Sequence, residues 1–166
     1  MKKCLLLVVF LCSSALSLQA QQVFDIVMDN ASRTVNNPTS SFSQVKLAQF
    51  KKTALTYMRQ QEAADSLIDF RVLDNQAFYL SQFITLYLKE FIKYSTSADG
   101  QQLSSVVKLF IKASLDCPMW NDSDIATTQA YVGDNEELTP FSLDTDWQKA
   151  YEEAQFLLKQ FSAQQP

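Results

Sequence analysis

The chain contains two serines that are each followed by a lysine three positions later, as Ser43–Lys46 and Ser105–Lys108. On a helix this spacing places a serine nucleophile beside a lysine, as in penicillin-interacting enzymes. The companion Ser-Asp-Asn and Lys-Thr-Gly motifs are absent from the sequence. Both pairs fall on expected helices whose opposite faces are apolar, so we interpret them as solvated helix surface.

Histidine is absent from the 166 residues, and its absence excludes several kinds of catalytic and metal centre. Ser–His and Cys–His nucleophile systems are impossible, and so are zinc sites built on imidazole. Of the three cysteines, Cys4 and Cys12 lie in a segment that resembles a secretion signal. We interpret the remaining Cys117 as a small buried apolar residue, while an intermolecular disulfide or a reactive thiol stays open.

Carboxylates near the C-terminus are the second set of groups that could do chemistry. A glycosidase needs one acid and one base or nucleophile about 5–10 Å apart, whereas helix capping and solubility are the alternative roles. The candidate acids are Glu136, Glu137, Asp144, Asp146, Glu152 and Glu153. The oxygen ligands at 122–124 and 134–137 lack the Asp-x-Asp-x-Asp-Gly pattern of a calcium loop, so we expect neither a metal nor a cofactor.

The segment from Asp116 to Pro166 combines aromatic residues with ten acidic and two basic residues. Aromatic rings beside carboxylates can hold sugars or peptides. The stretch from Gly133 to Leu143 reads as a mobile acidic loop, where binding residues often gather. The predicted recognition residues are Trp120, Tyr131, Asp134, Glu136, Glu137 and Phe141. The competing interpretations are that the aromatic rings pack in the core and that the loop is a solvated linker.

Residues 1–20 predict export as a signal peptide. Lys2 and Lys3 form a positive n-region, Leu5–Leu11 an apolar core, and Ala20 ends a cleavage motif. Cleavage before Gln21 would leave a mature chain of residues 21–166 in the periplasm or outside the cell.

Two other interpretations of this signal are weaker. An uncleaved anchor would need about 20 apolar residues, more than the run contains. Lipid attachment at Cys12 is disfavoured because the bulky Leu11 precedes it. Beyond the signal, the longest uncharged run, Asn75–Leu88, is too short and too polar to span a membrane.

Helical periodicity dominates the rest of the chain. A stripe of apolar residues over Leu73–Tyr94, widened by Phe78 and Ile92, predicts a helix at the centre of a bundle. Further helices are expected at Val23–Val35, after the Ser40–Ser41 cap region, over residues 103–111 and from residue 144 or 145 onward. The pattern predicts a single all-α domain, an antiparallel bundle of four main helices plus one short helix.

Individual residues predict the ends and faces of these helices. The short helix ends near Val132. Asp144 or Thr145 caps the last helix, and Thr145 with Gln148 would form a capping box. On the second helix, the basic residues lie mostly opposite the apolar face, namely Lys46, Lys51, Lys52 and Arg59.

Three segments resemble small exported proteins of Gram-negative bacteria that have no assigned function. They are FKKTALTYMRQ at Phe50–Gln60, LDNQAFYLSQF at Leu73–Phe83 and LTPFSLDTDWQKAY at Leu138–Tyr151. Together they cover under a quarter of the chain. The resemblance implies export and carries no catalytic residues.

These observations favour an exported, non-enzymatic helical protein that binds a protein or a cell-envelope partner through its acidic C-terminal third. The alternative is a small envelope hydrolase that cleaves glycans with carboxylates. A net charge of −4 without a basic stripe argues against nucleic acid as a partner.

Overall fold

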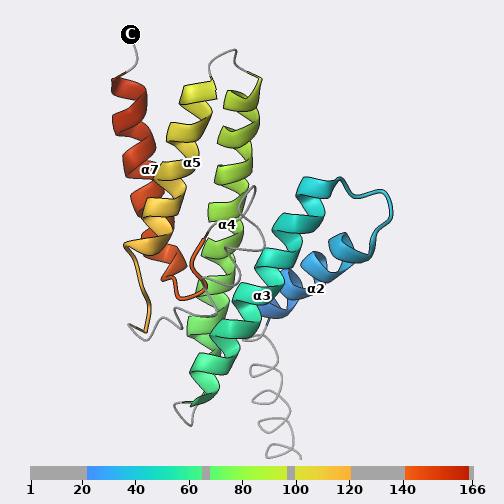
Figure 1. Ribbon diagram of the computed structural model, residues 1–166. Helices are drawn as coiled ribbons and strands as arrows, with labels where there is room; N and C mark the ends of the chain where they lie inside the picture. The colour runs from blue at the N-terminus through green and yellow to red at the C-terminus, as the bar shows by residue number, and fades with distance from the viewer. Residues whose placement is uncertain (1–21, 65–67, 97–99, 121–140, 165–166) are drawn as a thin grey trace, which may run out of the picture.

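The computed structural model describes residues 22–64, 68–96, 100–120 and 141–164, and these residues form helices and connections without a strand. The described helices are α2 (Gln22–Asn36), α3 (Phe42–Ala64), α4 (Phe70–Ser95), α5 (Gly100–Leu115) and α7 (Trp147–Ala163) (Figure 1). The all-α prediction is confirmed. The signal peptide and the short helix expected before Val132 lie outside the described residues.

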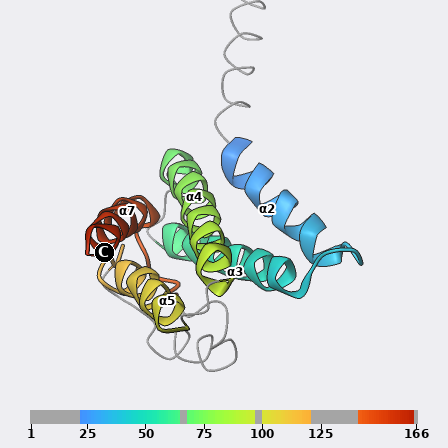
Figure 2. The same cartoon turned by 90° about the horizontal axis from the view of Figure 1, so that it is seen from above.

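Helix α4 is the central element and contacts each of the other four described helices. Helices α5 and α7 pack on one side of it, and α5 runs antiparallel to both α4 and α7 (Figure 1). Helices α2 and α3 form a hairpin against another side of α4, so that α4 lies between α2 and the α5–α7 pair (Figure 2). Helix α3 reaches α7 through the rings of Phe50 and Trp147.

The buried face of α4 confirms the predicted central helix. Its buried residues are Leu73, Gln76, Ala77, Leu80, Phe83, Ile84, Tyr87 and Tyr94. Phe78 and Ile92, expected to widen this stripe, are instead 46% and 54% exposed. Phe78 lies two positions from Leu80, which is about 200° around the helix. The apolar band is therefore narrower than the sequence predicts.

Helix α2 is attached to α3 and α4 through its first turn. The backbone N–H of Phe24 donates to Asp74 of α4 at 2.8 Å, and the Phe24 ring is buried. The guanidinium of Arg59 on α3 lies 4.9 Å from the centre of that ring. Because a first-turn N–H has no partner within its own helix, the Asp74 carboxylate also completes the end of α2.

Aromatic rings fill the core between α3 and α4. Phe141, six residues before α7 begins, contacts Phe50 of α3 and Phe83 and Tyr87 of α4, with ring centroids 5.0–5.6 Å apart. Trp147 adds edge contacts to Phe50 and Phe83 at 5.7 and 5.4 Å. Such edge-to-face pairs stabilise a core beyond the area that they bury.

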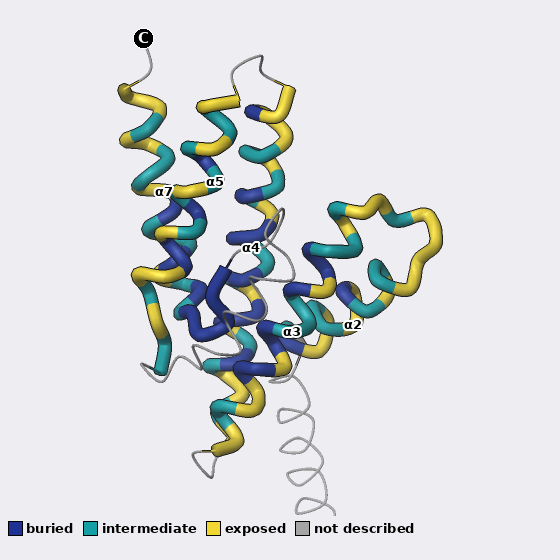
Figure 3. Tube along the Cα trace, viewed as in Figure 1, coloured by how far each residue is buried: buried dark blue, intermediate teal, exposed yellow. Residues whose placement is uncertain are grey.

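The connection that precedes α7 is buried from residue 141 to residue 145 (Figure 3). The prediction of a mobile acidic loop that reaches Leu143 is therefore wrong for its last three residues. Their side chains are covered by the bundle, so they are fixed in the core. Residues 133–140 of that predicted loop lie outside the described residues.

The cap of α7 also differs from the prediction. Asp146 is the N-cap, and its carboxylate accepts the backbone N–H of Lys149 at 3.2 Å. Asp144 and Thr145 are both buried before the helix begins, and Thr145 bonds to Ser114 on α5. Their side chains are therefore occupied elsewhere, and the expected capping box of Thr145 does not form.

Candidate functional site

Two of the six predicted recognition residues, Trp120 and Phe141, lie in the described part of the chain. Phe141 is fully buried among core rings, so its role in this structure is packing rather than recognition. Trp120 is half-buried and meets the Tyr57 ring edge-on at 6.2 Å. The other four residues lie outside the described residues, namely Tyr131, Asp134, Glu136 and Glu137.

Asp144 and Asp146, two candidate acids for a hydrolase, act as acceptors of backbone hydrogen bonds. One carboxylate oxygen of Asp144 accepts the N–H groups of Met119 and Trp120 at 3.2 and 3.1 Å. Burial acts to raise the pKa of Asp146, but hydrogen bonds from Gln76 and Lys149 outweigh it and hold that pKa below its usual value. A general acid for glycoside cleavage needs the opposite shift.

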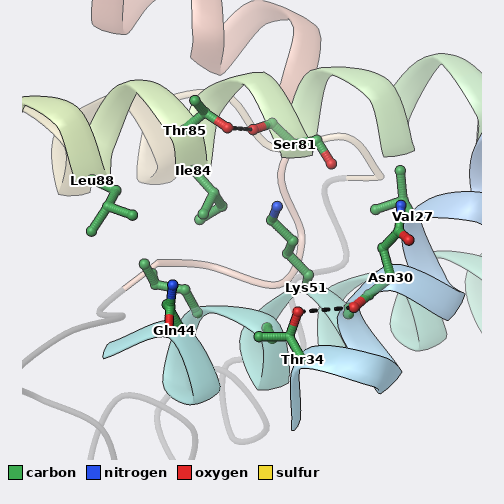
Figure 4. Close-up of a pocket in the computed structure, with 12 residues that line it drawn as sticks. Val27, Asn30, Thr34, Gln44, Lys51, Ser81, Ile84, Thr85 and Leu88 are labelled. Carbon is green, nitrogen blue, oxygen red and sulfur yellow. Dashed lines mark hydrogen bonds between the residues drawn. The ribbon is translucent and has the colours of Figure 1, made fainter. Parts of the chain in front are cut away.

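A pocket of about 320 Å³ lies where α2, α3 and α4 meet (Figure 4). Each helix lines it with four residues at positions i, i+3, i+4 and i+7, which is one face over two turns. The lining residues are Val27, Asn30, Ala31 and Thr34 of α2, Gln44, Leu47, Ala48 and Lys51 of α3, and Ser81, Ile84, Thr85 and Leu88 of α4. The buried residues Ala31, Leu47, Ala48 and Ile84 form its floor.

Lys51 is the charged residue of this lining. Its side chain extends from α3 towards α4, between Ile84 and Ser81 in the view of Figure 4. Burial lowers the pKa of the Lys51 ammonium. Within the described part of the chain no ion pair of Lys51 is found, and the twelve lining residues include no acid. The pocket therefore holds a partly desolvated positive charge without an ionic partner.

Gln44 supplies a second hydrogen-bond donor at the other end of the α3 stripe. Its side-chain oxygen accepts the backbone N–H of Ser41 at 2.8 Å, while its own backbone N–H reaches the Ser41 hydroxyl at 3.3 Å. This is a capping box at the start of α3, in the predicted cap region. Because the Ser41 N–H can only donate, the Gln44 oxygen must face it, and the amide NH₂ group remains for the pocket.

The threonines of the lining donate their hydroxyl hydrogens within their own helices. Thr34 donates its hydroxyl to the Asn30 carbonyl at 3.0 Å, and Thr85 donates to the Ser81 carbonyl at 2.7 Å (Figure 4). Their oxygens can still accept hydrogen bonds. Besides the Asn30 amide and the Ser81 hydroxyl, the pocket offers a ligand the Lys51 ammonium and the Gln44 amide as donors.

The chain matches no family model, no curated protein and no solved structure in the three comparisons made. Within the described residues, no group of three or more Cys, Asp or Glu side chains is placed to hold a metal ion. None of the described helices combines the length and the apolar character needed to cross a membrane.

The prediction from the sequence placed Lys51 on the wrong face of its helix. The prediction grouped it with Lys46, Lys52 and Arg59 opposite the apolar stripe. Lys51 is four positions after Leu47, however, and this spacing puts both residues on one face. That spacing was the signal in the sequence that marked Lys51 as a lining residue.

Proposed function

We propose that the chain is an exported, non-enzymatic helical protein that binds a component of the cell envelope and holds the anionic group of that ligand at Lys51. Export is supported by the signal peptide inferred from residues 1–20. Binding is supported by a half-buried cation that faces a pocket and lacks an ionic partner in the described residues. The proposed site is the α2–α3–α4 pocket, whereas the sequence analysis expects the site in the acidic C-terminal third.

The charge at Lys51 favours an anionic ligand. Desolvation destabilises an ammonium ion, and a bound anion would offset that loss. A hydrogen bond between charged partners contributes about 1.5–3 kcal/mol net. Because no acid lines the pocket within the described part of the chain, an anion would meet no like charge among these residues. Pockets of this size with a few polar groups on an aliphatic floor are typical of sites for small molecules.

The Ser81–Lys51 pair is the arrangement in the pocket closest to a catalytic one, and it fits binding better than acyl transfer. No hydrogen bond between these two side chains is found in the described structure. Ser81 lies in the middle of α4, where backbone N–H groups bond within the helix. Helix α4 therefore supplies no donors for the oxyanion that acyl transfer requires.

Anilinonaphthalene sulfonate, a small apolar anion that fluoresces when it leaves water, tests the pocket. We expect Lys51→Met to weaken its binding at least about tenfold, because a charge-assisted hydrogen bond is lost. The matched control is Lys52→Met, since Lys52 is the next residue on α3 and lines a different pocket. Equal affinities for the wild type and both variants would refute the proposal.

Export is tested separately by the intact mass of the protein recovered from the periplasm and the medium. We expect a chain that begins at Gln21 and carries no lipid. A mass that includes an acylated Cys12, or recovery in the cytoplasm alone, would contradict this part of the proposal.

A further inference from the structure

Two donors of the pocket, Gln44 and Lys51, lie at opposite ends of an aliphatic floor. Gln44 and Lys51 are seven residues apart on α3, which places them on one face about 10 Å apart along the helix axis. Leu47 and Ala48 lie between them and are buried. Ile84 of α4 covers the same stretch from across the pocket (Figure 4).

The orientation of the Gln44 amide follows from the capping box. The oxygen is held by the Ser41 N–H at 2.8 Å, so the NH₂ group faces away from the cap. In Figure 4 this nitrogen lies on the side of Gln44 that faces Ile84 and Leu88. Rotating the amide by half a turn would set two donors against each other, so the NH₂ group points away from the Ser41 N–H.

The pocket lining between Gln44 and Lys51 is mainly aliphatic. The apolar lining residues are Val27, Ala31, Leu47, Ala48, Ile84 and Leu88. The lining contains no aromatic ring on which a sugar or a base would stack. The polar lining residues Asn30, Gln44 and Thr85 are exposed and lie outside the buried floor of the pocket.

We propose that the ligand of this pocket is an elongated aliphatic carboxylate with a hydrogen-bond acceptor about 10 Å from its carboxylate, a length matched to the rise between residues 44 and 51 along α3. The carboxylate pairs with Lys51, the acceptor takes the Gln44 NH₂ group, and the hydrocarbon covers Leu47 and Ala48. This assignment rests on the proposed function and adds the ligand class and the role of Gln44.

Two carboxylates of similar length test the assignment by titration calorimetry. Monomethyl azelate carries an ester carbonyl at the required distance, whereas decanoate has only hydrocarbon there. We expect monomethyl azelate to bind about two- to tenfold more tightly, which is the range that a net hydrogen bond supplies. Trialanine, a carboxylate without continuous hydrocarbon, should bind at least about tenfold more weakly than either, because it buries less apolar surface.

Gln44→Glu isolates the amide donor. Glutamate keeps the oxygen that accepts from Ser41, so the capping box is retained while the NH₂ group is lost. We expect this variant to abolish the preference for monomethyl azelate over decanoate. The control is Gln49→Glu, which adds the same charge at an exposed position of α3 that lines a different pocket. It should leave the preference unchanged.

The outcomes separate the two proposals. If Lys51→Met weakens both carboxylates but Gln44→Glu leaves their ratio as in the wild type, the role of Gln44 is refuted and the anion site stands. Tighter binding of trialanine than of monomethyl azelate refutes the aliphatic ligand class. If Lys51→Met changes neither affinity, the proposed function falls together with this inference.

Discussion

The two sides of α4 are packed in different ways. Towards α5 and α7, the rings of Phe83, Tyr87 and Phe110 meet edge-on with centroids 5.2–5.3 Å apart. The buried hydroxyls of Ser114 and Thr145 bond to each other at 3.0 Å. Towards α2 and α3, α4 also borders a pocket of about 320 Å³, whose lining is aliphatic and polar and includes a half-buried cation. The first side resembles a close-packed interior, and the second resembles a binding site.

Helix α4 therefore contributes to the aromatic core with one face and to the pocket with another. Phe83 and Tyr87 belong to the aromatic core, whereas Ser81, Thr85 and Leu88 line the pocket. Changes on the aromatic side should therefore lower the free energy of unfolding. Changes at the polar lining of the pocket should alter binding with little loss of stability.

The largest effect is expected from a charge in the buried core of the bundle. Leu80→Asp places an unpaired carboxylate at a fully buried position and should prevent cooperative folding. Phe78→Asp is the matched control on the same helix, because Phe78 is 46% exposed and should tolerate the charge. Circular dichroism melts measure both variants. A wild-type melt for Leu80→Asp would mean that the buried face of α4 is wrongly assigned.

Phe141 tests whether the residue belongs to the core or to a recognition surface. Phe141→Ala should lower the free energy of unfolding by about 3–5 kcal/mol, as expected when a buried aromatic ring is removed. Urea unfolding measures the change. A recognition residue at the surface would show a loss of less than about 0.5 kcal/mol instead.

Asp146 tests the N-cap of α7. Asp146→Ala should cost about 0.5–2 kcal/mol, the usual effect of losing an N-cap. The control Asp116→Ala removes an exposed acid at the end of α5 and should cost less than about 1 kcal/mol. Thermal melts of both variants at neutral pH make the comparison, and equal losses would argue against the assigned cap.

The pKa of Asp146 gives this prediction a pH dependence. Its pKa is lowered in the folded state, so its stabilising contribution is present above the unfolded value near 3.9 and is lost as the pH falls below it. The stability difference between wild type and Asp146→Ala should therefore shrink in acid. A difference that grows as the pH falls from about 5 to about 2 would contradict the assigned shift.

The fold was predictable because helical periodicity is local. The spacing of Leu73, Leu80 and Ile84 places these residues on one face whatever surrounds the helix, and the structure buries all three. The narrower stripe and the burial of Phe141 were not predictable in this way. The width of the stripe depends on which helices cover α4, and the burial of Phe141 depends on how α3 and α4 pack around it.

The pocket was not predictable because its parts come from three helices. Each helix contributes a short stripe of mixed polarity that alone is typical of a partly buried face. Asp144 is a second example, because its type and position predict a helix cap. In the structure its carboxylate instead accepts the backbone N–H groups of Met119 and Trp120, which are distant in the sequence. Only the position of Lys51 relative to Leu47 was available from spacing.

The smallest effect on stability is expected at Lys51, on the pocket side of α4. Lys51→Met removes a half-buried charge that has no ionic partner among the described residues, so stability at neutral pH should be unchanged or raised by up to about 1 kcal/mol. Burial lowers the pKa of Lys51 in the folded state, so the folded protein releases this proton at a lower pH than the unfolded chain. The destabilising charge is therefore present at neutral pH and disappears as the pH rises towards the ordinary value of 10.5. The variant's advantage over wild type should shrink between neutral pH and about pH 10, as measured by urea unfolding. If Lys51→Met instead loses about 2 kcal/mol or more, the ammonium stabilises the bundle, and the contrast between the two sides of α4 fails at the residue on which the binding proposal rests.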